Sequence, residues 1–126
     1  VPQFTPGKEA STRLELRCPH PTANPYLAFA VMLEAGLRGI EEKIEPPLPI
    51  EKDAFKLSAE EVEKYHISAL PGSLGDALRV MEKGSIVKKV LGQYAYSKFY
   101  ETKHAEWVEF RKTVHTWERD MYLERF

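Results

Sequence analysis

The densest group of charged side chains in the sequence is Arg13, Glu15 and Arg17, which alternate with Leu14 and Leu16. In an extended backbone, residues two apart project from the same side and stand roughly 7 Å apart. One carboxylate between two guanidinium groups suits a phosphorylated substrate, because the carboxylate can bind a hard divalent cation and arginines can hold phosphate oxygens in bidentate fashion. The same pattern is also typical of a solvated sheet face whose charges compensate one another, and the spacing alone leaves both interpretations open.

The alternation over residues 12–18 predicts a strand with one buried face. Leu14, Leu16 and Cys18 lie on the apolar side, and the charged residues lie on the other side. Pro19 should end the strand, because proline has no N–H for the hydrogen-bond ladder. We expect Cys18, the single cysteine, to be a small core residue rather than a nucleophile, and it has no partner for an internal disulfide.

The other residues that could bind ligands form no comparable group. Lys8 follows Gly7 and resembles the end of a phosphate-binding loop, but it lacks the spacing of a Walker motif and taken alone is typical of a surface lysine. A structural zinc site is not expected, because there is no second cysteine and the histidines are scattered at His20, His66, His104 and His115.

A long helix is expected over residues 24–43. Asn24 can cap free N–H groups, and Pro25 suits the first helical turn. Apolar residues then recur three and four apart, and the first half of the helix is apolar on nearly all sides. This predicts that the first half is buried in a larger parent structure. Residues 45–57 contain three prolines and should form a loop.

Short helices are expected over residues 58–91. Ser58 with Glu61 forms a capping-box pattern, and Ser73 can cap the next helix. Two glycines should end the later helices, at Gly84 and Gly92.

Residues 93–126 have the three-four spacing of a long helix rich in aromatic residues. Two interpretations fit this segment, which is either a helix docked on its own domain or an arm that packs on a neighbouring subunit. The aromatic tail that would suit an arm consists of Trp117, Met121, Tyr122 and Phe126.

Together these elements predict a single, predominantly helical α+β fragment with one strand at residues 12–18 and an entering loop at residues 1–11. The chain of 126 residues begins on Val1 rather than Met, which suggests a piece of a longer protein. Its net charge of -1 argues against a nucleic-acid partner, and its longest apolar run, residues 26–33, is too short to cross a membrane. A single cysteine fits a reducing, cytoplasmic location.

Several segments closely resemble type I glutamine synthetases. The motif R-x-E-x-R-x-P at residues 13–19 is followed by A-N-P-Y-L at residues 23–27, and this combination is far more specific than one short motif. Further similarity lies in the Pro46-Pro47 loop and in L-P-G-S-L at residues 70–74. The resemblance covers essentially the whole chain, which corresponds to about the last quarter of a complete enzyme.

In that family, ATP phosphorylates the side-chain carboxylate of L-glutamate, and ammonia then displaces phosphate from the γ-glutamyl phosphate. The resemblance implies that Glu15 is a ligand of a divalent cation, Mg²⁺ or Mn²⁺, and that Arg13 lies near the ATP phosphates. Arg17 would be the catalytic residue that holds glutamate and its transferring phosphoryl group. Lys8 is a further candidate for an ATP contact, although Ala10 stands at the closest ungapped position to the lysine of the family.

Two departures from the family pattern are visible. His20 replaces a commonly acidic residue after the proline of the motif. Phe55 stands where some bacterial members carry a tyrosine that is adenylylated, and a phenyl ring has no hydroxyl to modify. We therefore expect this regulatory switch to be absent.

The resemblance also implies an assembly of two stacked hexameric rings, a dodecamer, in which the C-terminal segment reaches the opposite ring. The remaining metal ligands and most of the glutamate pocket would lie upstream, so the chain alone is expected to be inactive. Two alternatives stay open: a related ligase that uses another amine in place of ammonia, and a noncatalytic assembly or regulatory module.

Overall fold

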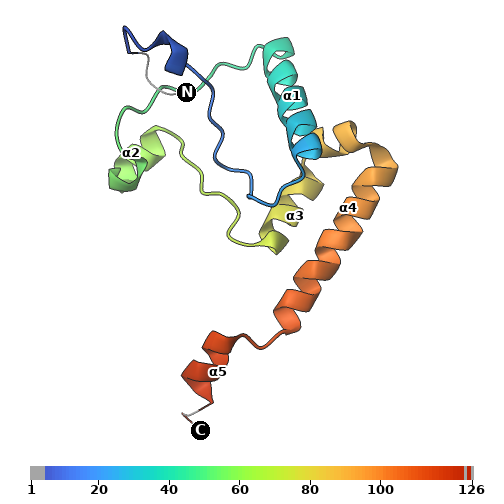
Figure 1. The fold of residues 1–126 in the computed structure, drawn as a ribbon. Coiled ribbons are helices and arrows are strands. Elements are labelled where there is room, and N and C mark those ends of the chain that lie inside the picture. The colour runs from blue at the N-terminus through green and yellow to red at the C-terminus, as the bar shows by residue number, and fades with distance from the viewer. Residues whose placement is uncertain (1–4, 124, 126) are drawn as a thin grey trace.

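The computed structural model describes residues 5–123 and 125 of the chain. The described part is built from helices connected by long loops, with no strand (Figure 1). The elements in chain order are the short 3-10 turn η1 (Glu9–Ser11), α1 (Pro25–Glu41), the 3-10 turn η2 (Ala54–Lys56), α2 (Ala59–Lys64), α3 (Leu74–Lys83), α4 (Ile86–Lys112) and α5 (Thr116–Tyr122).

The predicted strand over residues 12–18 is not formed. This segment runs without regular secondary structure between η1 and α1. A strand requires a neighbour that supplies its ladder hydrogen bonds, and none of the described residues pairs with it. The prediction that Cys18 is a core residue is also wrong for this chain, because the cysteine is exposed. The helical part of the predicted fold class is confirmed.

Helix α1 begins at Pro25 and is capped by Asn24, as the sequence predicts. The Asn24 side-chain oxygen accepts hydrogen bonds from the backbone N–H groups of Tyr26 and Leu27, at 3.0 and 3.4 Å. At the other end, Lys43 adopts a left-handed conformation with φ of 50°. The N–H of Ile44 then reaches back to the Gly39 carbonyl at 2.9 Å. This is the hydrogen bond of a Schellman motif, so α1 ends two residues before the expected boundary.

The predicted short helices are also found. The Ser58–Glu61 capping box opens α2, with both reciprocal hydrogen bonds present at 3.2 and 3.0 Å. The Ser73 hydroxyl accepts the Asp76 N–H at 3.1 Å at the start of α3, and Gly84 follows its last residue.

Helix α4 contains the break predicted at Gly92. This glycine has φ of 68° and ψ of 167°, so the hydrogen-bonded helix changes direction between a short first part and a long second part. The long part ends at Lys112 rather than continuing to the C-terminus, and α5 follows after a short connection. Phe126, predicted to belong to the aromatic tail, lies outside the described residues.

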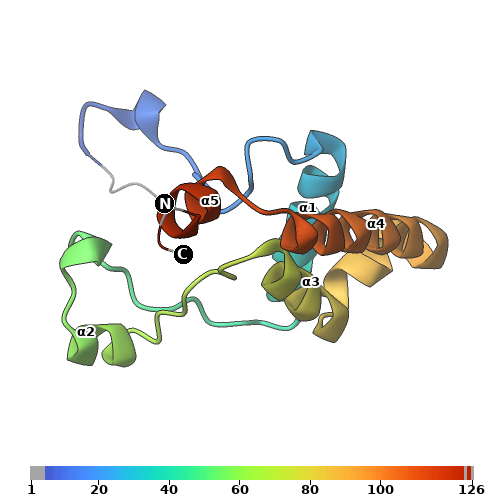
Figure 2. The same ribbon diagram turned by 90° about the horizontal axis from the view of Figure 1, so that it is seen from below.

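The packed part of the chain consists of α1 and α3 against α4, as both views show (Figures 1 and 2). Leu78 on α3 is the most buried hydrophobic residue, with 4% of its surface exposed. Gly75, also on α3, faces Trp107 of α4, and a Cβ at this glycine would lie 2.4 Å from the indole nitrogen. Glycine therefore permits the close approach of the two helices.

Helices α2 and α5 stand apart from this packed group, and within the described residues neither contacts another helix (Figures 1 and 2). Much apolar surface is exposed on the rest of the chain as well. The first half of α1, which the sequence predicts to be buried in a larger parent structure, is exposed here at Tyr26, Phe29 and Leu33. Its burial in a larger protein stays a prediction. No helix among residues 5–123 has the length and hydropathy to span a membrane.

Candidate active-site residues

The structure brings Arg13, Glu15 and Arg17 together. Arg13 Nε donates to Glu15 Oε1 at 2.6 Å, and Arg13 Nη2 lies 2.5 Å from the same oxygen. Arg17 Nη2 donates to Glu15 Oε2 at 2.7 Å, and Arg17 Nε lies 3.2 Å from that oxygen. Each guanidinium group therefore engages one oxygen of the carboxylate. The shared side predicted from the alternation is confirmed for these three residues, although no ladder holds their backbone.

The two arginines make the Glu15 carboxylate a stronger acid. The hydrogen bond from Arg17 is the largest cause, followed by that from Arg13, and both lower the pKa of Glu15 below its ordinary value. The carboxylate is accordingly charged at neutral pH. An ionised carboxylate is the form that binds a hard cation.

The two arginines differ in how firmly they are held. Arg17 is 87% exposed and has no partner but Glu15 among the contacts of the described residues. Arg13 is 57% exposed, and its Nη1 also donates to the Ser11 carbonyl at 3.0 Å. A guanidinium group has five N–H donors, so both arginines keep donors for an anionic ligand.

Lys8, the further candidate, is not part of this group. Its backbone carbonyl accepts the N–H and the hydroxyl of Ser11, at 2.9 and 2.7 Å. Its ammonium group takes part in none of the ion pairs found in residues 5–123. Its role as an ATP contact stays a prediction.

The donor chemistry of Glu15 fits Mg²⁺ or Mn²⁺, which prefer carboxylate oxygens. One carboxylate supplies only part of a coordination shell. The described residues contain no group of three or more His, Cys, Asp or Glu side chains placed to hold a metal ion. Within the described residues, Glu15 therefore has the chemistry of a single metal ligand and not of a complete site.

A large apolar cavity of ≈ 600 Å³ lies on the other side of the same segment. Leu16 and Cys18 line it together with Leu27 of α1 and Phe99 of α4. The alternation predicts the apolar side of residues 12–18, but it gives no sign that helices from distant parts of the sequence face that side. The lining of the cavity is mainly apolar but includes Thr22, Asn24 and Lys103, so the cavity is suited to apolar packing.

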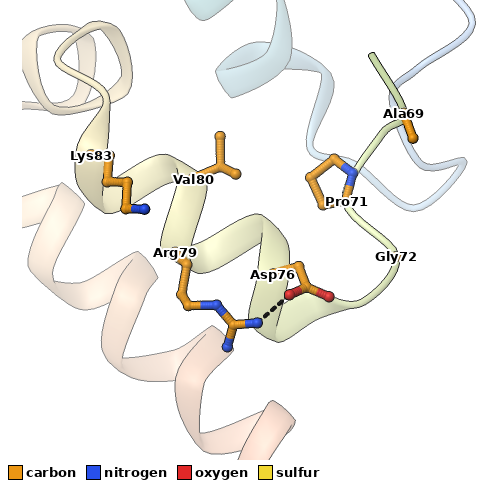
Figure 3. A pocket seen from close by; sticks show the side chains of 7 residues that line it. All are labelled: Ala69, Pro71, Gly72, Asp76, Arg79, Val80 and Lys83. Atoms are coloured by element: carbon orange, nitrogen blue, oxygen red, sulfur yellow. Dashed lines mark hydrogen bonds and ion pairs between the residues drawn. The ribbon is translucent and has the colours of Figure 1, made fainter.

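A smaller cavity of ≈ 350 Å³ lies between residues 69–72 and α3 (Figure 3). Figure 3 shows Asp76 and Arg79 joined as an ion pair at its edge. Asp76 also accepts the Ser73 hydroxyl at 2.7 Å, and this hydrogen bond is the largest cause of its lowered pKa. Ser73 and Asp76 thus serve the cap of α3, and Arg79 is paired with Asp76.

Phe55 lies on η2, in the loop before α2, and its surface is 100% exposed. The Asp53 carboxylate accepts the Phe55 N–H at 3.1 Å and fixes the turn. Lys52 pairs with Glu61 of α2 at 2.5 Å, which ties the loop to the helix. The position is thus accessible, but its side chain carries no nucleophile.

Residues 1–122 match the family described as glutamine synthetase, catalytic domain. The chain is 44% identical over 115 residues to a glutamine synthetase of Thermus thermophilus, covering 91% of this chain and 26% of the relative. It is 46% identical over 113 residues to one of Methanocaldococcus jannaschii, covering 90% of this chain and 25% of the relative.

A further relative is a glutamine synthetase of Clostridium saccharobutylicum, 40% identical over 120 residues, with 95% of this chain and 27% of the relative covered. The chain thus spans about a quarter of the length of the curated relatives that it matches.

Proposed function

Because the chain belongs to the glutamine synthetase catalytic-domain family, we propose that it forms the C-terminal part of the catalytic domain of an ATP-dependent ligase. The enzyme joins ammonia to L-glutamate through a γ-glutamyl phosphate intermediate. The observation that carries this proposal is the pairing of Arg13, Glu15 and Arg17 within a family match that covers residues 1–122.

The three charged residues have separate roles in this reaction. Arg13 contacts the ATP phosphates, and Arg17 holds glutamate and the transferring phosphoryl group. Phosphoryl transfer depends mainly on positioning and on neutralising the charge of the phosphate oxygens, which is the chemistry that two exposed guanidinium groups can supply. Lys8 is a weaker candidate for an ATP contact, because its position differs from that of the lysine in the family.

Glu15 supplies one ligand to a divalent cation. When bound, Mg²⁺ or Mn²⁺ would offset the negative charge of the phosphate oxygens. Glu15 is suited to this role because the flanking arginines keep it ionised. A carboxylate has more lone-pair positions than the hydrogen bonds from Arg13 and Arg17 occupy, so Glu15 could bind a cation and keep both arginines.

The chain by itself does not make glutamine. Its described residues form no group of three or more possible metal ligands, and relatives named glutamine synthetase are about four times as long. The complete enzyme is a cytoplasmic homo-oligomer of two stacked hexameric rings, in which the segment around α5 packs on a neighbouring subunit. The exposed apolar side chains of α5 and its flanks, which include Trp117 and Leu123, favour this arrangement.

The test replaces Glu15 by Ala and by Gln in the full-length gene product that carries this chain. Both variants should lower metal-dependent glutamine formation by about 100-fold or more, because loss of one transition-state contact of this kind costs that much. Glu60→Ala, an exposed carboxylate on α2, is the matched control. Size-exclusion chromatography must show unchanged assembly.

An effect of Glu15→Ala on assembly alone, with full turnover, would instead identify a noncatalytic module. The amine is tested in the same assay by comparing ammonia with methylamine, since residues 13–17 act on glutamate and ATP and do not select the amine. Preference for methylamine would identify a related ligase.

A further inference from the structure

The turn before the site residues is held by side chains that the proposed reaction does not use. Gly7 has φ of 81°, and its N–H is accepted by the Glu9 carboxylate at 2.9 Å. The Thr12 N–H is accepted by the Glu9 carbonyl at 3.0 Å. Glu9 therefore holds both ends of the turn of residues 7–12, through its side chain at Gly7 and through its backbone carbonyl at Thr12.

This turn places one particular backbone group beside the site. The Ser11 N–H and hydroxyl both bond to the Lys8 carbonyl, which fixes the orientation of the peptide at Ser11. The Ser11 carbonyl then accepts Arg13 Nη1 at 3.0 Å. Arg13 is thus held at two points, by Ser11 on one side and by Glu15 on the other.

The two contacts determine which donors of Arg13 remain for a ligand. Nε, Nη1 and Nη2 each direct a donor to Ser11 or Glu15. Each terminal nitrogen carries a second N–H, so one donor on Nη1 and one on Nη2 remain. A pair of donors on one planar group suits two oxygens of a phosphate.

We propose that Glu9 is a positioning residue, which closes the turn of residues 7–12 so that the Ser11 carbonyl orients the Arg13 guanidinium group toward the phosphates of ATP. This inference rests on the proposed function, in which Arg13 contacts ATP. Holding Arg13 before the nucleotide arrives reduces the entropy that binding must otherwise cost. Glu9 itself touches neither the nucleotide nor the metal.

The test measures binding of Mg²⁺–ATP by isothermal titration calorimetry in the full-length gene product. Glu9→Ala removes the acceptor of the Gly7 N–H and should weaken ATP binding about fivefold, the effect of one ordinary hydrogen bond. Glu9→Gln keeps an acceptor oxygen and should bind ATP like the parent protein. Glu51→Ala, another exposed loop glutamate, is the matched control and should also bind like the parent protein.

The decisive comparison is a double-mutant cycle with Arg13→Ala. If Glu9 acts through Arg13, Glu9→Ala should have no further effect on ATP binding once Arg13 is replaced. The KM for ATP should rise in Glu9→Ala while the KM for glutamate stays constant, which a general loss of folding would not produce.

Three results would overturn the inference. Additive losses in the cycle would mean that Glu9 acts independently of Arg13, for example through Lys8. Equal weakening by Glu9→Gln and Glu9→Ala would mean that the charge matters rather than the acceptor. Unchanged ATP binding in Glu9→Ala, with a clear loss in Arg13→Ala, would refute the positioning role and leave the proposed function intact. If Arg13→Ala itself has no effect, the ATP contact assigned to Arg13 is wrong.

Discussion

At the scale of single residues, the contacts among Arg13, Glu15 and Arg17 follow from their spacing of two positions along the chain. Arg13 and Arg17 each lie two positions from Glu15, so an extended backbone is sufficient to bring their side chains together. Ion pairs as exposed as these contribute little to folding stability. In the proposed function, they present a charged carboxylate and guanidinium donors at one place, which phosphate chemistry requires and folding does not.

Phe55 is the position where the resemblance leads us to expect a modifiable tyrosine in regulated members of the family. Its ring is fully exposed on a turn fixed by Asp53, so access does not limit modification. We predict that the full-length protein, incubated with ATP and a bacterial adenylyltransferase, gains no adenylyl group on the peptide containing residue 55. Peptide mass spectrometry is the measurement, and Phe55→Tyr, which restores the acceptor hydroxyl, is the control. An adenylyl group on this peptide of the parent protein would refute the prediction.

At the scale of elements, local hydrogen bonds define where the helices begin. Asn24, Ser58 and Ser73 each accept backbone N–H groups that have no partner within the first helical turn. Because these contacts span two or three residues, the boundaries of α1, α2 and α3 follow from local sequence. The packing of α3 on α4 has a different origin, since it brings Gly75 against Trp107 across a large sequence separation.

The contact between α3 and α4 gives an element-scale prediction. In Gly75→Ala the new Cβ would lie within 2.9 Å of three atoms of the Trp107 ring. The overpacking should destabilise α3 locally by about 1–3 kcal/mol. Hydrogen exchange of the amides of residues 74–83 in the full-length protein measures this loss as faster exchange.

Gly36→Ala on α1 provides the matched control, because a Cβ there meets nothing within 4 Å. It should leave exchange in α3 unchanged and stabilise α1 by up to about 1 kcal/mol. Equal exchange in α3 for the Gly75→Ala and parent proteins would contradict the proposed packing role.

At the scale of the whole molecule, many large hydrophobic side chains of the described residues are exposed. Leu78 is the sole buried hydrophobic residue of the described part. The exposed set includes residues of α1, the tail, and the segment before α1. Large exposed apolar patches are typical of interaction surfaces. A protein about four times as long, as the relatives are, offers partners for these surfaces within and between subunits.

This surface predicts self-association of the chain when it is prepared as residues 1–126. Trp117 on α5 is 63% exposed, and burying a side chain of this size contributes about 2 kcal/mol before ordering costs. Sedimentation velocity over a range of concentrations should show a rising weight-average sedimentation coefficient. Trp117→Ser combined with Leu123→Ser should reduce the rise, and Asp120→Ser, at an exposed polar position of the same helix, serves as the control. A strict monomer at high concentration would contradict the prediction.

The sequence by itself determined the features that arise from contacts between near neighbours. These are the caps of α1, α2 and α3, the break at Gly92 and the shared side of Arg13, Glu15 and Arg17. Only the tertiary structure decided which helices pack together and where the cavities lie. It also decided that residues 12–18 do not form a strand and that Cys18 is exposed, because a strand needs hydrogen-bond partners and a core needs covering residues from other segments.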